Sequence, residues 1–570
     1  MCGFCGIIRF DDQVVDHAVL KAMSQSIAHR GPDESRVWIN QVRNVGLAHQ
    51  RLAIIDLSSD AGQPMHLDSN LSIVFNGEIY NYIELREDLI KQGVNFKTQS
   101  DTEVLIQLFK IYGKDCLEKL DGMFAFAIYN QQTKEIFLAR DRVGEKPLYY
   151  VLSDNYFLFG SEIKSFFPYM NLKVDLDRVS NYLFSGEILY HHGTCFKQVE
   201  SMPAASWMSI QNGNKQIGTY WEIDLSKKVR YTNEQDYIDH FRELFDQSVK
   251  RRLRSDVTVG SSLSGGIDSS SIVCSVSKQS KLKYKTFSAR FPGAEKDEGV
   301  WIDKVVQKTG VENISILPQA NAMLDLLKKL LWHQEFLIGS SSIFAQYEVM
   351  QSVRANEVIV LLDGQGADEF LAGYDNLRYY SIWDAYRRGD WKRFKHESKT
   401  LRAKGNKVSV GWMFLLDPIL IPLGIKRSVY QNGTTLKEQL KYSITTTLAE
   451  LLRYADRNSM AASVEVRLPF TYHKLIEFAF AIPDELIYKN GRTKYILRES
   501  MREDLPYEIY NRIDKIGFAP PQNNWIQTEP WQKEFQRSVA LLSEKGIDAR
   551  QCDTFRTIIS ANFLETFSLS

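Results

Sequence analysis

Short apolar runs separated by turn residues dominate about the first 190 residues of the chain. These runs cover residues 3–9, 45–48, 73–75, 124–129 and 136–139. Residues 82–92 and 102–112 instead repeat their apolar positions with helical spacing. The pattern predicts a mostly antiparallel sheet with helices packed on it, which is an α+β arrangement.

The hydrophobic pattern changes beyond residue 233, where long helical stretches alternate with short runs rich in β-branched residues. The runs at 257–263, 286–290 and 358–362 predict buried strands of a parallel α/β sheet. After Tyr374 the pattern is largely helical. The polar stretch 211–215 separates the two patterns, so we expect one domain over residues 1–215 and a second over residues 225–570.

The composition is that of an ordinary globular protein, with 44% hydrophobic and 25% charged residues. Its 570 residues exceed what one hydrophobic core usually holds, which agrees with at least two domains. Lys and Arg together number 70, as do Asp and Glu. No overall positive field therefore favours nucleic acid or an anionic membrane surface as a partner.

Neither the cysteines nor the apolar segments indicate an extracellular or membrane protein. The six cysteines show no disulfide framework and no paired metal-ligand spacing, which is typical of a reducing compartment. Residues 412–425 are apolar, but they are too few to span a bilayer and include Asp417, Pro418 and Pro422. No signal-peptide pattern opens the chain, and we expect a cytoplasmic protein without a membrane span.

Cys2 follows the initiator methionine and would become the first residue once Met1 is removed. Its thiol and a free α-amine would then share one residue, and an α-amine with a pKa of about 8 is partly unprotonated at neutral pH. A terminal amine that activates a nucleophile on its own side chain is an established catalytic arrangement. A second-position cysteine is usually incidental, so the rest of the chain must support this interpretation.

Two glycine-rich loops follow predicted strands of the second domain. The first, Ser264-Gly265-Gly266-Ile267-Asp268-Ser269, leads into a helix whose N-terminal N–H groups suit phosphate oxygens. The second, Asp363-Gly364-Gln365-Gly366-Ala367-Asp368-Glu369, lies at the carboxyl end of a buried strand, where α/β sheets bind ligands. Asp268 and Asp368 are suited to Mg²⁺ that arrives with a nucleotide. The two loops together predict an ATP site.

Polar clusters in the first domain have the chemistry needed to bind an amino acid that carries an amide. Arg51 can hold an α-carboxylate with two hydrogen bonds, and Glu78 and Asp101 can accept hydrogen bonds from an α-ammonium group. The side-chain amide of Asn76 and the N–H of Gly77 can form an oxyanion hole. Taken with a terminal cysteine, these residues form a coherent site for amide hydrolysis.

The same motifs carry a resemblance to known families. Class II glutamine amidotransferases resemble this chain at Met1-Cys2-Gly3, Arg30-Gly-Pro-Asp33, Asn76-Gly-Glu-Ile-Tyr-Asn81, Gly122-Met-Phe-Ala-Phe126 and Arg140-Asp-Arg-Val-Gly-Glu-Lys-Pro-Leu-Tyr149. The synthetase half of glutamine-hydrolysing asparagine synthetases resembles residues 264–270, residues 364–369 and Ser463-Val-Glu-Val-Arg-Leu-Pro-Phe470. The resemblance covers nearly the whole chain in the same order.

The resemblance implies an N-terminal-nucleophile (Ntn) hydrolase sandwich, followed by an ATP-pyrophosphatase-type (HUP-like) α/β domain with a helical C-terminal part. It implies that Cys2 attacks the amide of L-glutamine and that ammonia travels through an internal tunnel to a second site. There ATP and Mg²⁺ would convert a carboxylate into an acyl-adenylate. The implied glutamine-binding residues are Arg51, Leu52, Ala53, Ile54, Ile55, Asn76, Gly77, Glu78 and Asp101.

The second site is implied in the same way. Its ATP-binding residues would be Leu263, Ser264, Gly265, Gly266, Asp268, Ser269, Ala289, Asp363 and Gly364. Lys494 matches a lysine that stabilises charge at the adenylate. Gln365 and Asp368 lie where the acceptor is activated, and Asp268 and Asp368 would hold the metal ion.

Several positions near the acceptor site depart from the family pattern. Gln365 replaces the glutamate of a Gly-Glu-Gly motif that is implicated in adenylate formation. Residues 338–343 lack an arginine that some members carry, and Pro469-Phe470-Thr471-Tyr472 replaces Pro-Phe-Leu-Asp. These changes leave the implied ATP- and Mg²⁺-dependent chemistry in place. The identity of the acceptor, however, depends on them.

Three interpretations of function follow. The first is a glutamine-dependent asparagine synthetase that converts L-aspartate to L-asparagine, with AMP and diphosphate as products. The second is an amidotransferase of the same fold that amidates another carboxylate, such as a sugar acid in polysaccharide assembly or a peptide side chain. A non-enzymatic relative is disfavoured because Cys2, Asp268, Asp368 and Lys494 are all present. The resemblance leaves a homodimer open.

Overall fold

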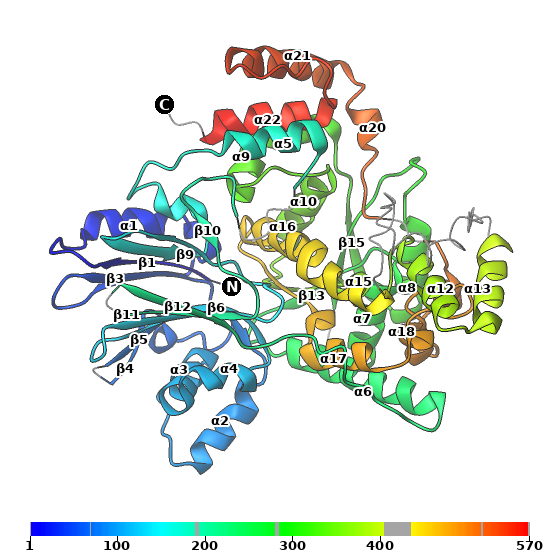
Figure 1. Cartoon of the computed structure of the whole chain (residues 1–570), viewed down its shortest axis with the longest axis horizontal. Coiled ribbons are helices and arrows are strands. Elements are labelled where there is room, and N and C mark those ends of the chain that lie inside the picture. The colour runs from blue at the N-terminus through cyan, green and yellow to red at the C-terminus, as the bar shows by residue number, and fades with distance from the viewer. Residues whose placement is uncertain are drawn as a thin grey trace.

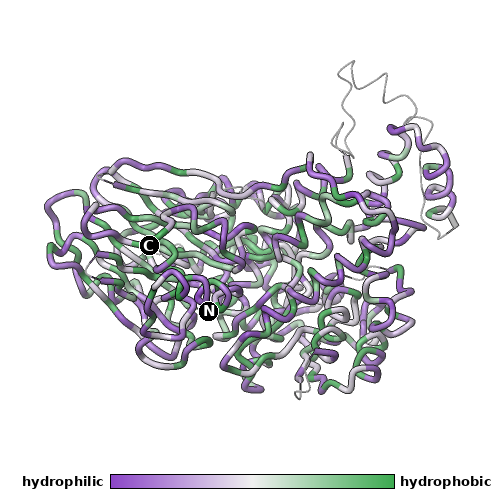
Figure 2. Tube along the Cα trace, turned by 90° about the horizontal axis from the view of Figure 1, so that it is seen from below, coloured by the Kyte–Doolittle hydropathy of each residue, from purple (hydrophilic) through white to green (hydrophobic). Residues whose placement is uncertain are grey.

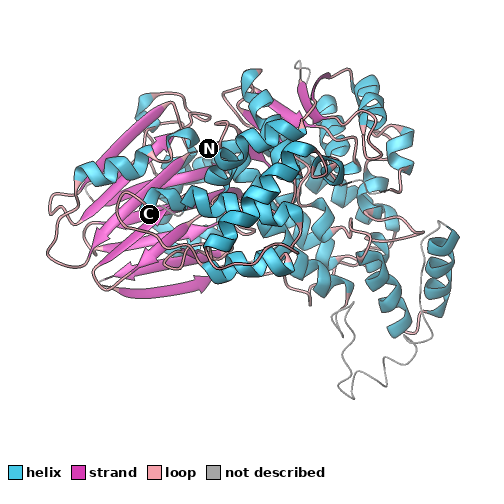
Figure 3. Ribbon diagram, turned by 90° about the horizontal axis from the view of Figure 1, so that it is seen from above, coloured by secondary structure: helices cyan, strands magenta, loops and turns pink. Residues whose placement is uncertain are grey.

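A computed structural model describes residues 2–68, 70–188, 193–211, 213–279, 284–403, 435–514 and 517–567 of the chain. A sandwich half, residues 3–219, lies beside a parallel-sheet half, residues 234–567, and the N terminus lies between them (Figure 1, Figure 3). Hydrophobic stretches lie mainly inside both halves (Figure 2). Within the described ranges no helix is long and apolar enough to cross a membrane, and the apolar segment 412–425 lies outside those ranges.

The sandwich half consists of two six-stranded antiparallel sheets, as the predicted Ntn hydrolase fold requires. The first sheet has the strand order β10 (Glu200–Ser201), β8 (Tyr149–Leu152), β9 (Tyr156–Gly160), β1 (Gly3–Arg9), β3 (Val45–Arg51), β2 (Glu34–Ile39). The second has the order β12 (Asn214–Thr219), β11 (Ser206–Gln211), β7 (Glu135–Arg140), β6 (Gly122–Asn130), β5 (Leu71–Ile79), β4 (Met65–Leu67). Within the polar stretch 211–215, Gln211 at the end of β11 pairs with Asn214 at the start of β12, so the second sheet extends to Thr219.

Side chains of β1 alternate between the two faces of the first sheet, and this alternation explains why the sheet has a hydrophobic core on each side. Phe4 and Ile8 pack between the two sheets, whereas Cys5 and Ile7 point to the opposite face and pack in the core beneath the helices there. Successive strand residues face opposite sides, so one apolar strand can serve two cores. The outer face of the second sheet is covered by α2 (Tyr82–Lys91), α3 (Asp101–Tyr112) and α4 (Cys116–Lys119).

The parallel-sheet half contains five parallel strands in the order β15-β14-β13-β16-β17. Their bounds are β13 (Val259–Ser262), β14 (Lys285–Ala289), β15 (Glu312–Ile316), β16 (Val360–Leu362) and β17 (Glu465–Arg467). The three predicted strands are present as β13, β14 and β16, and the predicted α/β class is confirmed. The sequence pattern did not reveal β17, because a three-residue strand with two charged ends carries no periodic apolar signal.

The helices cover the outer faces of the sandwich and make up most of the parallel-sheet half. Those of the first half not yet given are α1 (His17–Gln25) and α5 (Leu176–Ser185). Those of the second half are α6 (Glu234–Arg252), α7 (Ile267–Gln279), α8 (Gly299–Thr309), α9 (Ala320–Gln334), α10 (Ser342–Ala355), α11 (Ala367–Phe370), α12 (Leu377–Arg387), α13 (Trp391–Ala403), α15 (Leu436–Ser443), α16 (Ala449–Met460), α17 (His473–Ala481), α18 (Tyr495–Ser500), α19 (Tyr507–Asn511), α20 (Gln522–Trp525), α21 (Glu529–Glu544) and α22 (Thr554–Phe567).

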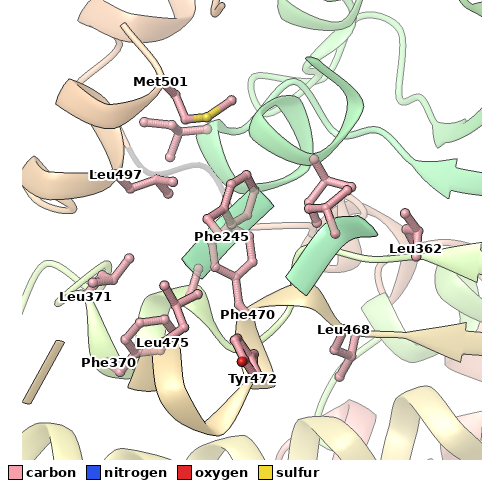
Figure 4. Close-up of a cluster of buried hydrophobic side chains, with 14 of the residues drawn as sticks. Phe245, Leu362, Phe370, Leu371, Leu468, Phe470, Tyr472, Leu475, Leu497 and Met501 are labelled. Atoms are coloured by element: carbon pink, nitrogen blue, oxygen red, sulfur yellow. The ribbon is translucent and has the colours of Figure 1, made fainter. Parts of the chain in front are cut away.

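The core of the parallel-sheet half joins the sheet to α6 and to the segment after β17. Phe245 of α6 stacks on Phe470, with 5.1 Å between ring centroids, and Leu362 at the end of β16 belongs to the same cluster (Figure 4). Truncating such a buried phenylalanine to alanine typically costs about 3–5 kcal/mol. This packing holds the ends of β16 and β17 in place, where the candidate residues lie.

Buried ion pairs connect the two halves. Arg30 contacts Glu162 at 2.7 Å within its own half and Asp456 of α16 at 2.8 Å across the boundary. Arg457, also from α16, contacts Glu162 across the boundary at 2.9 Å and Glu335 within its own half at 2.6 Å. All of these side chains are almost fully buried. Breaking such a pair by removing one partner is costly, so the two halves are fixed relative to each other.

Candidate active sites

Cys2 directly precedes β1, a central strand of the first sheet, and its side chain is buried. Its backbone N–H donates to Oδ1 of Asn76 at 3.1 Å, and its Sγ lies 3.8 Å from the carbonyl oxygen of Leu52. Burial raises the pKa of the thiol. Because Asn76 belongs to β5 of the other sheet, the candidate nucleophile lies where the two sheets meet.

Asn76 and Gly77 have the geometry of an oxyanion hole next to Cys2. The Nδ2 of Asn76 is buried and donates no hydrogen bond to any described residue. Gly77 has φ +152°, and a Cβ at this position would lie 2.0 Å from the carbonyl oxygen of Met123. No side chain other than hydrogen fits there, so the glycine is required by close backbone contact.

Glu78 and Asp101 form an acidic pair beside this position. Burial raises the pKa of Glu78 well above its usual range, and the neighbouring carboxylates of Glu465 and Asp101 raise it further. Asp101 begins α3 and accepts the backbone N–H of Ile79 at 2.9 Å. Burial raises the pKa of Asp101 to about 6. Both carboxyls are thus held in an environment that a cationic ligand would stabilise.

Arg51 shapes the loop that carries residues 52–55. Its guanidinium donates to the carbonyl oxygen of Ser58 at 2.6 Å and to that of Asp56. The N–H of Ala53 donates to Asp33 at 2.8 Å. The structure therefore brings the predicted glutamine-binding residues to one end of the sandwich, and Arg51 makes backbone contacts there.

The second candidate site lies at the carboxyl ends of β13, β14 and β16. A cavity of about 230 Å³ is lined by Leu263, Ser264, Gly266, Asp268, Ser269, Ala289, Asp363, Gly364, Gln365, Asp368 and Lys494. Gly265 belongs to the same loop; it has φ +74°, and a Cβ there would lie 2.5 Å from the side chain of Trp301. The structure thus gathers the predicted ATP-binding residues from three separate segments around one cavity.

Lys494 is the centre of charge in this cavity. Its Nζ lies 2.5 Å from Oδ2 of Asp268 and 2.6 Å from Oδ1 of Asp368. The side chain is almost fully buried, and its backbone adopts φ +54°, a left-handed conformation. The two carboxylates hold the ammonium group where it can meet an anionic ligand.

The cavity also contains residues that the sequence did not single out. Arg512 contacts Glu298 at 2.9 Å and donates to the carbonyl oxygen of Gly265 at 3.0 Å. Arg512 therefore supports the loop 264–269, although the two lie 247 positions apart in the sequence. Its only sequence signal is a charged residue after a helix, which is too common to identify a site.

No group of three or more His, Cys, Asp and Glu side chains in the described ranges is placed to hold a metal ion. Asp268 and Asp368 provide two carboxylates, and Oδ1 of Asp268 is buried without a hydrogen-bond partner among the described residues. Carboxylate oxygens together with nucleotide phosphates are the usual ligands of Mg²⁺. The donor set therefore fits a magnesium ion that is bound together with a nucleotide.

Two sequence families match the chain. Residues 1–221 match the family described as Glutamine amidotransferase domain, and residues 240–558 match the family described as Asparagine synthase. The second match alone covers more than half of the chain. The chain belongs to the asparagine synthase family.

Named relatives agree with this assignment. Asparagine synthetase [glutamine-hydrolyzing] 1 of Bacillus subtilis strain 168 is 32% identical over 96% of this chain and 91% of its own length. Asparagine synthetase [glutamine-hydrolyzing] 3 of the same organism is 29% identical over 96% and 93%. Amidase chry2 of Gibberella zeae is 27% identical over 90% and 86%. A solved structure of the allosteric regulatory enzyme of purine biosynthesis is a distant match, with 15% identity, a TM-score of 0.31 and coverage of 64% and 74%.

The protein is therefore an enzyme of the glutamine-hydrolysing asparagine synthetase family, a ligase that joins a glutamine amidotransferase domain to an ATP-using synthetase domain. The sequence analysis missed how this synthetase connects its domains. Strand β17 brings Glu465 close enough to Cys2 for its charge to contribute to the raised pKa of the thiol, after burial. The sequence Ser463-Val-Glu-Val-Arg alternates two charged residues with apolar ones, which is the pattern of a strand. The sequence analysis assigned no function to these residues.

Proposed function

We propose that this enzyme forms L-asparagine from L-aspartate, ATP and L-glutamine. The observation that carries the proposal is the position of Lys494 between Asp268 and Asp368 in a cavity lined by both glycine-rich loops. An ammonium group at this place can stabilise negative charge that develops as a carboxylate is adenylated. The named relatives from Bacillus subtilis support aspartate as the carboxylate.

In the glutaminase half, residues 1–215 in the proposed division, removal of Met1 would leave the nitrogen of Cys2 as a free amine held by Oδ1 of Asn76. The amine takes the thiol proton, and the sulfur attacks the amide carbon of glutamine. Nδ2 of Asn76 and the N–H of Gly77 stabilise the oxyanion. Ammonia leaves with the proton, and water then hydrolyses the thioester to glutamate.

Glutamine itself would be held by the residues around Cys2. Arg51 and residues 52–55 would face the α-carboxylate, while Glu78 and Asp101 accept hydrogen bonds from the α-ammonium group. The raised pKa of Asp101 and of Glu78 supports this role, because a bound cation would offset the repulsion between the two buried carboxylates.

In the synthetase half, residues 225–570, the loops at 264–269 and 363–364 would bind ATP. Asp268 and Asp368 would hold Mg²⁺, which when bound neutralises phosphate charge. The carboxylate of the acceptor attacks the α-phosphorus, diphosphate leaves, and Lys494 stabilises the charge. Ammonia from the glutaminase half then attacks the acyl carbon, and AMP leaves as the amide forms.

The test is diphosphate release with ATP, Mg²⁺ and glutamine, measured with and without L-aspartate, together with assay of asparagine in the same mixture. Equal amounts of aspartate-dependent diphosphate and asparagine are expected. Glutamine hydrolysis without aspartate-dependent diphosphate would contradict aspartate as the acceptor.

A second candidate is the amidation of another carboxylate, such as a sugar acid or a peptide side chain. Two observations favour it. Gln365 lines the cavity where the resemblance implies glutamate, and relatives that align over about nine-tenths of this chain bear the name amidase. A panel of carboxylates in the diphosphate assay separates the two candidates.

A further inference from the structure

Helix α13 carries a positively charged face that no described residue covers. Lys392, Lys395 and Lys399 are spaced by three and four residues, so they lie on one side of the helix. All three side chains are exposed. Within the described ranges, none of their ammonium groups forms a hydrogen bond or an ion pair. Like charges at these spacings repel one another, and an anionic partner would relieve that repulsion.

The opposite side of α13 is fixed to the body of the synthetase half. Glu397 is buried and accepts the backbone N–H groups of Asn490 and Gly491, each at 2.8 Å. Leu401, one turn further along the helix, is almost fully buried. These contacts hold the lysine face on the outside of the fold. Figure 1 shows α12 and α13 at the end of the molecule away from the sandwich half.

An aromatic cluster adjoins the lysine face at the start of α13. Trp391 is 53% exposed and directly precedes Lys392. The centroid of its ring lies 5.2 Å from that of Tyr386 of α12 and 6.2 Å from that of Phe394. Tyr386 in turn stacks on Trp383, with 5.1 Å between ring centroids. A half-exposed tryptophan beside lysines is typical of protein surfaces that meet the membrane–water interface.

Positive charge is concentrated in this part of the chain, although the whole chain has no excess of it. Residues 387–407 contain nine Lys and Arg but only two Asp and Glu. Of these two acids, Asp390 accepts the backbone N–H of Arg393 at 3.0 Å, and Glu397 is buried on the other side of the helix. Neither of them pairs with a lysine of the exposed face. The balanced total of charges therefore conceals a locally basic surface.

Phosphate groups of lipids and of nucleic acids would both attract these lysines, but the neighbouring sequence favours lipids. The described chain stops at Ala403, the last residue of α13, and resumes at Thr435. The sequence between them holds the apolar run 412–425, followed by Lys426 and Arg427. Apolar residues with basic residues beside them are the composition of segments that lie at a bilayer surface. Recognition of nucleic-acid phosphates requires no such run.

We propose that the outer face of α13, formed by Trp391 and the three lysines, binds a membrane surface that contains anionic lipids. The ammonium groups would lie at the lipid phosphates, and the indole would lie at the boundary between headgroups and acyl chains. The contact is peripheral, and salt weakens it because it is mainly electrostatic. This association does not depend on which carboxylate the enzyme amidates.

The test measures how much full-length enzyme sediments with lipid vesicles. One set of vesicles contains phosphatidylcholine alone, and the other contains phosphatidylcholine and phosphatidylglycerol in equal parts. The test variant combines Lys392→Glu, Lys395→Glu and Lys399→Glu. The matched control makes the same change of net charge at three exposed lysines of the sandwich half, Lys21→Glu, Lys173→Glu and Lys197→Glu. Wild-type glutaminase activity in the absence of vesicles shows that both variants are folded.

The wild type and the control variant are expected to bind the vesicles that contain phosphatidylglycerol, and to bind neutral vesicles weakly. The test variant should bind the anionic vesicles about a hundredfold more weakly, because each lysine near such a surface contributes about a factor of five to the binding constant. Trp391→Ala keeps the lysines and should weaken binding by about tenfold, since the indole no longer buries apolar area.

Two results with vesicles would overturn the membrane surface. One is a wild-type enzyme that stays in the supernatant with both kinds of vesicle, and the other is a test variant that binds anionic vesicles as tightly as the wild type. A third contrary result is a gel shift of RNA that requires the same three lysines while vesicles are not bound. That result would assign the face to nucleic acid.

Discussion

The guanidinium of Arg467 lies 3.5 Å from a carboxylate oxygen of Glu78, although the two residues belong to different halves of the molecule. The carbonyl oxygen of Arg467 accepts the N–H of Asp363 at 3.0 Å, and its Nε donates to Glu465 at 2.6 Å. Asp363 lines the ATP cavity, and Glu78 is a candidate glutamine ligand. A single residue thus touches elements of both candidate sites.

Arg467→Met is expected to destabilise the protein by about 3–5 kcal/mol, because it removes the guanidinium that contacts the buried carboxylates of both Glu465 and Glu78. Urea unfolding at pH 7 measures the change. Arg537→Met is the control, since Arg537 forms an exposed pair with Glu565, and its loss should cost less than about 1 kcal/mol. If the two variants lose similar amounts of unfolding free energy, burial does not determine how much these ion pairs contribute to stability.

Cys2→Ala is expected to abolish glutamine-dependent synthesis and to leave ammonia-dependent synthesis unchanged. The substitution removes the sulfur nucleophile, whereas Cys2 is not among the described residues that line the ATP cavity. Diphosphate release with glutamine or with ammonium chloride measures the two activities. A folded variant that loses both would show that the nitrogen source and the synthetase site are not separable.

Much of the fold could be predicted from the sequence, because long periodic segments determine it. Apolar periodicity predicts β1, β5, β6, β7, α2 and α3. These elements make up much of the sandwich half. The division into two facing sheets followed only from the family resemblance and not from the apolar pattern, because strand order depends on contacts between residues far apart in the chain. The pairing of β1 with β9, for example, joins residues about 150 positions apart.

The candidate sites were predictable only where a short motif carries the chemistry. The two glycine-rich loops and Asn76-Gly77 have such motifs, and the structure places the loops after β13 and β16 and Asn76-Gly77 within β5. Arg512 lies in no such pattern, because its contact with the carbonyl oxygen of Gly265 joins residues 247 positions apart. Such a contact depends on the folded structure and cannot be seen in a sequence.

Asp101→Asn is expected to stabilise the protein at pH 8 while it weakens glutamine binding. The pKa of Asp101 is about 6 in the folded protein and about 4 when unfolded, so the folded state binds the proton more tightly. The stability contributed by this proton is complete below pH 4 and is lost as the pH rises through 6. A pKa difference of two units corresponds to about 3 kcal/mol in the free energy of unfolding. The Asp101→Asn variant should be more stable than the wild type by about this amount at pH 8.

Urea unfolding of the Asp101→Asn variant and the wild type at pH 4 and pH 8 checks this sign. The two proteins should have similar stability at pH 4 and differ at pH 8. Glutaminase assays should show a higher KM for glutamine, because the amide cannot neutralise an α-ammonium group. A variant that is less stable than the wild type at pH 8 would contradict the burial argument.

Lys494→Met is expected to reduce ammonia-dependent synthesis by about 10²–10³-fold, the usual effect of removing one preorganised group that stabilises developing charge. Glutaminase activity should persist, because Lys494 contacts Asp268 and Asp368 only within the synthetase site. Lys489→Met is the control, since Lys489 pairs with Glu234 outside the cavity. Equal effects of the two substitutions would remove Lys494 from the proposed mechanism.

Gln365→Glu tests the identity of the acceptor. Oε1 of Gln365 is buried in the cavity wall, and none of the described residues donates a hydrogen bond to it. If L-aspartate is the acceptor, a glutamate here should raise aspartate-dependent diphosphate release, since a carboxylate supplies proton-transfer capacity that an amide lacks. A positioned acid–base group contributes about 10²-fold or more.

The matched control for this substitution is Gln346→Glu, which adds the same charge at another wall of the cavity. It should not raise the rate, because its effect on the acceptor is electrostatic only. A fall in the rate with Gln365→Glu would mean that the glutamine amide itself contacts the acceptor. The acceptor would then be a molecule that needs a hydrogen-bond donor at this position, and L-aspartate would give way to another carboxylate.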